Sequence, residues 1–159
     1  MFRRTQLISF TFLFSLCTGS AAFAQSQDFD IRPLSDRLTG EAITKAFKGV
    51  THEGAYNFDA LGRPGRFYKE IHAPDGGITY KERGGTVTGR WRVSPKDEVC
   101  YSYDGGLIAG GCFQVYQLGT CYYFYSALEL SFRDDMTEDD WTARSVKKGD
   151  RASCEDMVS

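Results

Sequence analysis

The chain has 159 residues and a formal net charge of −2. This length is enough for one domain with a modest hydrophobic core. Non-specific nucleic-acid binding needs a clustered basic face, so the weak acidity argues against a nucleic-acid partner. After residue 24 no stretch is apolar for long enough to cross a membrane, so we expect no transmembrane segment in the mature chain.

The first 24 residues have the pattern of an export signal. The pair Arg3-Arg4 forms a basic start, and Leu7 to Leu16 is an apolar run that is too short for a membrane span. Ala22-Phe23-Ala24 is a cleavage site of the A-x-A type. We therefore expect a signal peptide over 1–24, a flexible segment over 25–37, a β-rich domain over 38–159, and a periplasmic or secreted protein.

One helix is predicted between Thr39 and Lys48. Thr39 is a suitable N-cap, Glu41 lies in the first turn where the helix dipole favours an acid, and Gly49 supplies a stop. The apolar stripe of this helix consists of Ile43, Ala46 and Phe47. The helix would either plug or flank a sheet, or dock onto a partner.

From Val50 onward the pattern is that of β-structure. Short stretches with alternating apolar and polar residues are separated by turns rich in glycine and proline. The expected fold is mainly β: one small antiparallel β-barrel, or a strongly curled meander of about eight strands, with one short N-terminal helix. The predicted strands cover 51–58, 66–72, 78–83, 86–93, a strand around 99–103, 112–118 and 120–126, with weaker candidates at 129–133 and 141–146.

The central hairpin has the clearest alternation. Ser94-Pro95-Lys96-Asp97 fits a type I turn, because proline suits its second position. If this turn closes the hairpin, Trp91 lies opposite Cys100 and Arg90 lies opposite Tyr101. Residues that lie opposite one another share a face of the sheet. Trp91 and Cys100 would then both point inward, while Arg90 and Tyr101 would point outward.

Four cysteines remain after the signal peptide, and an even number in an exported chain favours disulfides over a metal site. Three pairings are possible. We favour Cys100–Cys112, which would join adjacent strands, together with Cys121–Cys154, which would tie the tail to the sheet. Loop entropy would contribute about 3 kcal/mol for the first bond and about 4 kcal/mol for the second.

The chain contains a predicted helix followed by Gly49-Val50-Thr51, the stretch FYKEIHAPDGG at 67–77 with its Pro-Asp-Gly turn, Gly-Arg-Trp at 89–91, and paired cysteines in CYSY at 100–103 and GGCFQVY at 110–116. With these motifs the chain resembles a family of small exported bacterial proteins known only as a domain of unknown function. The resemblance covers Leu38 to Tyr125, while Cys121 and Cys154 are not part of the family's pattern. It implies export and a β fold, and it supplies no catalytic residues.

The sequence indicates no catalytic residue, metal ligand or cofactor. It lacks the G-x-S-x-G, P-loop and H-E-x-x-H patterns. His52 and His72 fall in predicted strands without a readable nucleophile beside them, so we interpret them as structural or surface histidines. The acidic residues between Asp134 and Asp140 lack the spacing of a calcium loop and are interpreted as a solvated loop.

Tyrosines crowd three successive strands and provide the main functional clue. Within 122–125 aromatic side chains must appear on both faces of a strand, so one set would pack in the core. The other set would either form a contact surface or be covered by a helix or the tail. The predicted binding residues are Arg90, Tyr101, Tyr103, Tyr123 and Tyr125, because tyrosine and arginine dominate binding hot spots.

These observations favour an exported, non-catalytic binding or inhibitory module that acts on an envelope protein or glycan. Two alternatives remain open. One is a hydrolase of cell-envelope material with carboxylates in a barrel mouth, and the other is a structural envelope component without a discrete ligand.

We predict that the mature protein begins at Gln25. A lipoprotein would instead be modified at Cys17, but Leu16 is bulkier than the small residue that lipidation favours at that position. The intact mass of the exported form checks this prediction, and acyl chains on Cys17 would contradict it.

Overall fold

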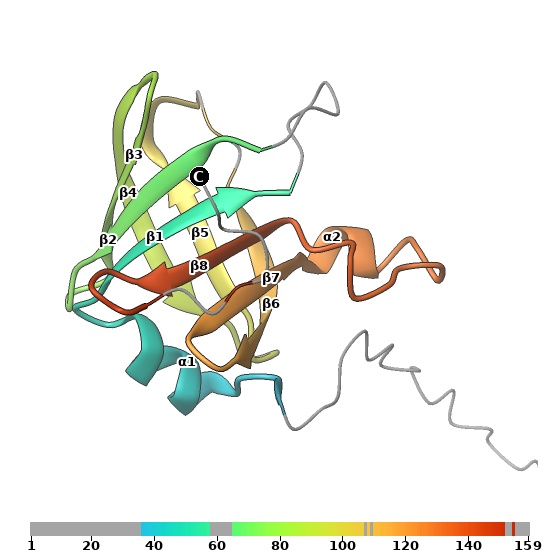
Figure 1. The fold of residues 1–159 in the computed structure, drawn as a ribbon. Helices are drawn as coiled ribbons and strands as arrows, with labels where there is room; N and C mark the ends of the chain where they lie inside the picture. Colours follow the sequence, from blue (N-terminus) through green and yellow to red (C-terminus); the bar gives the residue numbers. More distant parts are fainter. Residues whose placement is uncertain (1–35, 58–64, 107, 109, 152–153, 155–159) are drawn as a thin grey trace, which may run out of the picture.

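The chain folds into a closed barrel of antiparallel strands (Figure 1). The structure is a computed structural model that describes residues 36–57, 65–106, 108, 110–151 and 154. Each strand pairs with its neighbours in sequence, and the last strand pairs with the first to close the barrel. The expected signal peptide, most of the segment 25–37 and the last residue of the strand predicted over 51–58 lie outside the described residues.

The elements follow one another as a simple meander, in the order predicted for a mainly β protein. The prediction of a small antiparallel barrel with one N-terminal helix is confirmed. The elements are α1 (Gly40–Phe47), β1 (Thr51–Tyr56), β2 (Phe67–His72), β3 (Gly77–Glu82), β4 (Gly85–Val93), β5 (Val99–Tyr103), the 3-10 turn η2 (Asp104–Gly106), β6 (Gly111–Leu118), β7 (Cys121–Ser126), α2 (Ala127–Leu130) and β8 (Ala143–Lys147).

The strand predicted at 129–133 is wrong. The chain there forms the short helix α2, whose first turn is capped by Ser126, because the Ser126 hydroxyl accepts a hydrogen bond from the Glu129 amide at 3.4 Å. The connection between β7 and β8 then projects away from the barrel wall (Figure 1). Side-chain capping by serine competes with strand formation at this point.

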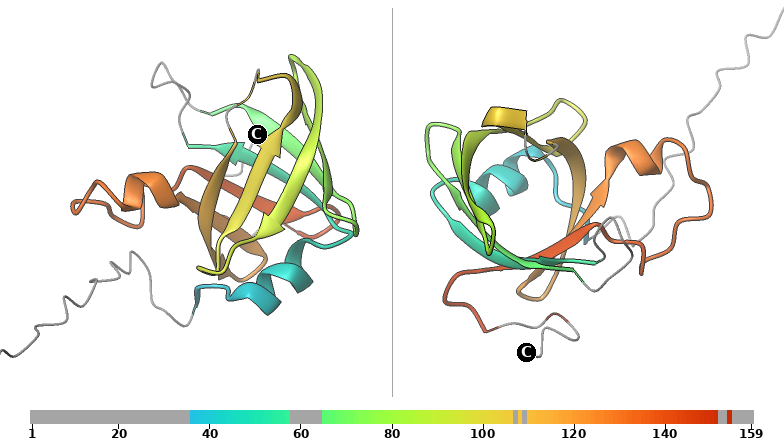
Figure 2. Two further views of the ribbon diagram at one scale, coloured as in Figure 1. Left: turned by 180° about the vertical axis from the view of Figure 1, so that it is seen from behind. Right: turned by 90° about the horizontal axis from the view of Figure 1, so that it is seen from above.

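Helix α1 lies across one end of the barrel, as the views in Figure 2 show. Ile43 and Phe47 are fully buried. The predicted N-cap, Thr39, makes no capping bond with its side chain, and the Asp97 carboxylate instead accepts from the Gly40 amide at 2.7 Å. Of the two readings of this helix, the structure supports the one in which it plugs the sheet.

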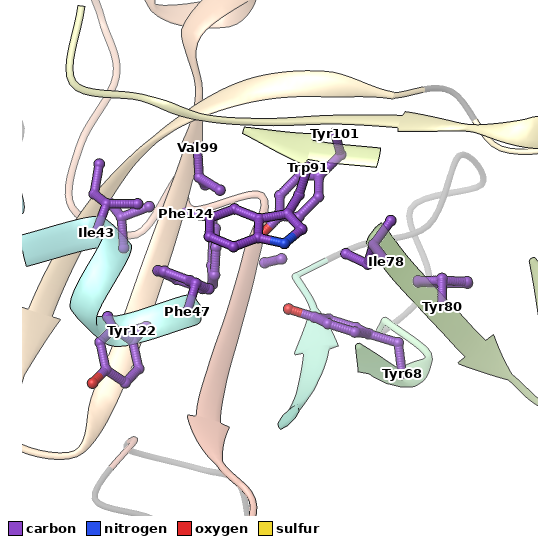
Figure 3. Close-up of a cluster of buried hydrophobic side chains, with 13 residues drawn as sticks. Ile43, Phe47, Tyr68, Ile78, Tyr80, Trp91, Val99, Tyr101, Tyr122 and Phe124 are labelled. Atoms are coloured by element: carbon purple, nitrogen blue, oxygen red, sulfur yellow. The ribbon is translucent and has the colours of Figure 1, made fainter. Parts of the chain in front are cut away.

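Large side chains fill the barrel where α1 closes it (Figure 3). The Phe47 ring stacks on the His52 imidazole with centroids 4.5 Å apart and meets the rings of Tyr122 and Phe124 edge-on, each at 5.8 Å. An eight-stranded barrel is just wide enough for its inward side chains to fill it. Phe47 therefore belongs to the barrel core although it lies on the helix.

The predicted register of the β4–β5 hairpin is wrong by one residue. Trp91 lies opposite Tyr101, and Arg92 lies opposite Cys100. The hairpin closes between Ser94 and Glu98, and Asp97 has a left-handed φ of 57°. A type I turn followed by a left-handed residue adds one position to the loop. A shift of one residue exchanges the two faces of a strand, so Cys100 lies outside and Tyr101 inside.

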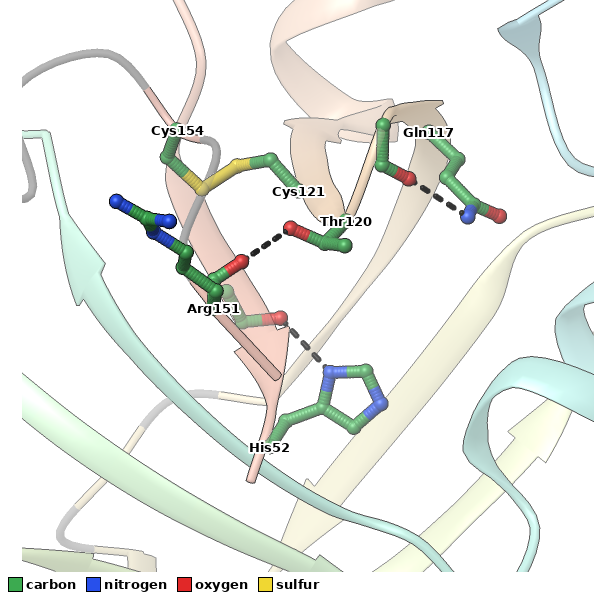
Figure 4. Close-up of a disulfide and its surroundings, with 8 residues drawn as sticks. His52, Gln117, Thr120, Cys121, Arg151 and Cys154 are labelled. Atoms are coloured by element: carbon green, nitrogen blue, oxygen red, sulfur yellow. Dashed lines mark hydrogen bonds between the residues drawn. A yellow bond between two sulfur atoms is a disulfide. The ribbon is translucent and has the colours of Figure 1, made fainter. Parts of the chain in front are cut away.

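Both favoured disulfides are present. Cys100–Cys112 joins β5 to β6 on the outer face, and Cys121–Cys154 ties the tail to the start of β7 (Figure 4). Both are compatible with an extracellular or periplasmic location, where disulfides persist. Within the described part of the chain, no helix combines the length and apolarity needed to cross a membrane.

We predict that Trp91→Ala lowers the free energy of unfolding by about 3–5 kcal/mol, as truncation of a large core aromatic does. Trp91 is buried inside the barrel, and its indole donates to the Ala73 carbonyl at 3.2 Å. The predicted register would have placed Trp91 on the same face as Cys100, but Trp91 points inward and the Cys100–Cys112 bond lies on the outer face.

Urea denaturation of the oxidised protein measures the effect. Arg92→Ala, on the exposed outer face of the same strand, is the control and should change stability by about 0.5 kcal/mol or less. Equal midpoints for the two variants would contradict the burial of Trp91.

Candidate functional site

The structure does not bring the five predicted binding residues together on one surface. Tyr101 and Tyr103 point into the barrel, whereas Arg90 is exposed on the outer face and donates to the Asp75 carbonyl at 3.0 Å. Tyr123 and Tyr125 are on the outer side of β7, but both are buried. The exposed tyrosine–arginine patch expected from the sequence is therefore absent among the described residues.

A second layer of side chains covers the outer tyrosines. The Tyr125 hydroxyl donates to the Glu138 carbonyl at 2.6 Å, and the Tyr123 ring meets Trp141 edge-on at 6.2 Å. Met136 and Cys154 complete this outer cluster. The alternative in which a helix or the tail covers these rings is thus the correct one, with the β7–β8 connection and the tail forming the cover.

A cavity of about 160 Å³ lies inside the barrel, toward the end opposite α1. The direction of β1 shows this. Helix α1 leads into the first residue of β1, whereas the cavity contacts Tyr56, which is the last residue of β1. Figure 3 shows three of its lining residues, Tyr68, Tyr101 and Phe124, within the buried cluster. The full lining is Tyr56, Tyr68, Glu70, Tyr101, Tyr103, Gly111, Phe113, Phe124, Thr142 and Ala143.

Glu70 is the single carboxylate among the described residues that line this cavity, and it is 5% exposed. The Tyr103 hydroxyl donates to its Oε1 at 2.5 Å. Burial raises the pKa of Glu70 to about 7, although the Tyr103 hydrogen bond acts in the opposite direction. The group therefore changes its charge near neutral pH.

His72 is the nearest basic side chain to Glu70, with its Nε2 lying 3.8 Å from Oε2. Burial lowers the pKa of His72 to about 3, and the neighbouring His52 contributes in the same direction. The imidazole is consequently neutral when Glu70 ionises, so we do not treat the two as an ion pair. Nε2 also lies 3.2 Å from the Tyr101 hydroxyl, while Nδ1 has no hydrogen-bond partner among the described residues.

The tyrosines around the cavity stay protonated at neutral pH. Burial raises the pKa of Tyr56 to about 12, and it raises the pKa values of Tyr68, Tyr101 and Tyr103 well above the ordinary value. They contribute aromatic rings and hydroxyl groups to the lining but no charge. Tyr56 and Tyr103 are only half-buried, so they lie where the cavity approaches solvent.

Gly54 makes room for one of these rings. A Cβ at this position would lie 2.7 Å from the Tyr68 hydroxyl oxygen and 2.3 Å from the Arg144 carbonyl. A side chain on Gly54 would therefore displace Tyr68 from the cavity wall or separate β1 from β8.

The serine–histidine pair in the barrel is structural. His52 Nδ1 lies 2.9 Å from the Ser145 hydroxyl (Figure 4), and Nε2 lies 3.3 Å from the Ala46 carbonyl. Both side chains are 0% exposed, and the His52 ring stacks on the Phe47 ring. Burial lowers the pKa of His52 to about 4. A nucleophile must reach its substrate, so this pair does not form an accessible catalytic dyad.

Two other groups with metal-binding chemistry are occupied by internal contacts. Cys100 and Cys112 lie near the Glu98 carboxylate, but both sulfurs are in a disulfide and offer no thiolate. In the acidic loop, Asp140 accepts hydrogen bonds from the Thr137 amide and hydroxyl. Its second oxygen lies 3.5 Å from the Arg133 guanidinium.

Sequence reasoning missed Glu70 as a site residue. It predicted a strand over 66–72 but gave neither face of that strand a role. The available signal was the pattern of Tyr68, Glu70 and His72 at intervals of two, which places three hydrogen-bonding side chains on one face. Only closure of the barrel makes that face the interior.

Comparison with known proteins does not assign a family. No protein-family model matches the chain, and no curated protein matches it either. The resemblance to a family of small exported β proteins therefore stays an expectation from the sequence.

We predict that Glu70→Gln steepens the loss of stability on acidification. Glu70 has a raised pKa, so between about pH 4.5 and 7 the folded state holds a proton that the unfolded state releases. Stability from this group is therefore lost as pH rises. His52 and His72 have lowered pKa values and oppose it, because below about pH 6.5 the unfolded state binds protons that the folded state excludes.

Replacement of the titrating Glu70 carboxyl by an amide should therefore add about 1.4 kcal/mol per pH unit to the slope of the unfolding free energy against pH between pH 5 and 6.5. Above pH 7 the variant should be more stable than wild type by up to about 3 kcal/mol, because burial no longer has to raise the pKa of a carboxyl from 4.5 to about 7. Urea denaturation across pH 5–8 measures both effects. Glu53→Gln, whose carboxylate lies 2.8 Å from the Lys69 amine and is 46% exposed, is the control. Parallel curves for Glu70→Gln and wild type would refute the burial of an ionisable carboxyl.

Proposed function

We propose that this protein is an exported, non-catalytic binding module that acts in the periplasm or outside the cell. Its partner would be an envelope protein or glycan, as the sequence favours, and one terminal group of that partner would enter the cavity. The observation that supports this proposal is the unequal filling of the barrel. The end beneath α1 is packed with side chains, and the other end holds a cavity of about 160 Å³ with a buried carboxylate.

The cavity has the properties of a binding site rather than of a packing defect. Protein interiors contain few voids larger than a water molecule. A cavity of about 150 Å³ can accommodate a molecule of the size of benzene. Ligand sites combine aromatic walls with a small number of polar groups, and here tyrosine rings surround Glu70.

The hydrolase alternative receives less support. Glycoside hydrolysis uses two carboxyl groups on either side of the scissile bond. Glu70 is the one carboxylate among the described lining residues, and the Ser145–His52 pair is fully buried. The structural-component alternative gives no reason for a polar cavity. Binding without catalysis is consequently the function that we propose.

A cavity-filling variant tests this function. Ala143 is buried in the cavity wall, so Ala143→Leu should occupy the space while leaving the strands intact. We expect wild-type protein incubated with a periplasmic and envelope-glycan extract to retain a ligand that native mass spectrometry detects. The variant should lose it. Ala127→Leu, on α2 outside the barrel, is the matched control and should retain it.

Equal retention by wild type and Ala143→Leu would overturn the cavity as the binding site. Release of cleaved glycan fragments by the wild-type protein, absent with Ala143→Leu, would favour the hydrolase instead.

A further inference from the structure

We propose that the cavity binds the ammonium group of a small organic cation, a protonated amine or a quaternary ammonium, with the Glu70 carboxylate as its counter-ion. This inference rests on the proposed function and names the chemical class of its ligand. It depends on three features of the cavity: a buried carboxylate without a cationic partner, walls lined by tyrosine rings, and a size that fits a small head group.

Glu70 lacks a permanent positive partner. Among the described residues its contacts are the Tyr103 hydroxyl at 2.5 Å and the His72 ring at 3.8 Å, and the His72 ring is neutral at physiological pH. A buried carboxylate without a cation is costly, because water no longer solvates the charge. A ligand that carries a positive charge would remove that cost, whereas a neutral ligand would not.

The rest of the wall suits a cation as well. Tyr101 and Tyr103 are parallel, with ring centroids 6.2 Å apart, and Tyr56 packs beside Tyr68 at 4.9 Å. Aromatic faces attract cations, and cages of such rings recognise quaternary ammonium groups. The volume of about 160 Å³ accommodates a head group of this size.

The charged and titratable groups around Glu70 define how binding depends on pH. The tyrosines of β1, β2 and β5 remain neutral, and His72 on β2 stays unprotonated above about pH 3. On β3, Glu82 accepts from the Tyr80 hydroxyl at 2.9 Å and pairs with Arg66 at 3.2 Å. Glu70 is thus the group whose ionisation near pH 7 would control affinity.

Calorimetric titration of the mature, oxidised protein with choline and with tetramethylammonium tests the inference. We expect both to bind at pH 8. The neutral isostere 3,3-dimethylbutan-1-ol should bind at least about tenfold more weakly, since it has the shape of choline without the charge. Affinity should fall by up to about tenfold per pH unit below pH 7, because binding then displaces a proton from Glu70.

Two variants isolate the carboxylate. Glu70→Gln keeps the shape and a hydrogen-bond acceptor for Tyr103, and it should abolish both the preference for the cation and the dependence on pH. Glu53→Gln on the outer face removes an acid of the same type and should leave affinity within about twofold of wild type. Thermal melts show that each variant is folded before titration.

A glucosamine oligomer and its N-acetylated counterpart extend the test to an ammonium group carried by a glycan. Tighter binding of choline than of its neutral isostere, or of the glucosamine oligomer than of its N-acetylated counterpart, supports the inference. Which of the two cationic compounds binds shows whether the ammonium group is carried by a free small molecule or by a glycan. Equal binding of choline and its neutral isostere, or an unchanged preference in Glu70→Gln, would overturn it. If the cations fail to bind while wild type still retains a ligand that Ala143→Leu loses, the proposed function stands without this ligand class.

Discussion

The contact of Phe47 with His52 determines how the interior of the barrel is divided. Helix α1 inserts the Phe47 ring into one end, where it stacks on the imidazole at 4.5 Å. His52 is then sealed from water, which favours its neutral form and lets it bond to Ser145 and the Ala46 carbonyl. Because the plug fills that end, any space left in the barrel lies at the other.

The two ends therefore differ in chemistry as well as in volume. Near α1, the polar atoms of the histidines lie among aromatic rings, and most of them have partners within the protein. Where the cavity begins, Glu70 accepts a hydrogen bond from one hydroxyl and contacts no cation among the described residues. Buried charges are ordinarily paired, so the exception is informative about function.

Much of the fold could be predicted from the sequence, because alternation along each strand reflects burial of one face. Most strands and helix α1 followed from such local patterns, and the favoured disulfide pairing is present, whereas the strand predicted at 129–133 is the helix α2. The β4–β5 register did not follow from local patterns, since it depends on the left-handed backbone of Asp97, which a proline-containing turn motif does not reveal. Because of this one extra loop residue, Tyr101 lies in the interior and not on the surface as predicted, and the candidate site is inside the barrel. Tyr123 and Tyr125 are covered by the β7–β8 connection and by Cys154 in the tail, and the alternation within β7 does not reveal these contacts.

Both disulfides and the second aromatic cluster lie outside the barrel interior, so they stabilise the fold without filling the cavity. Cys100–Cys112 and Cys121–Cys154 restrict the unfolded chain without occupying interior volume. The cluster around Tyr116 and Tyr125 adds buried apolar surface on the outer side of β6 and β7. Stability supplied from outside allows the interior to keep an unfilled space and an unfavourably buried carboxyl. Sites that bind ligands are commonly less stable than they could be. In the binding module that we propose, the unfilled space and the buried carboxyl are confined to the part of the barrel that α1 does not fill.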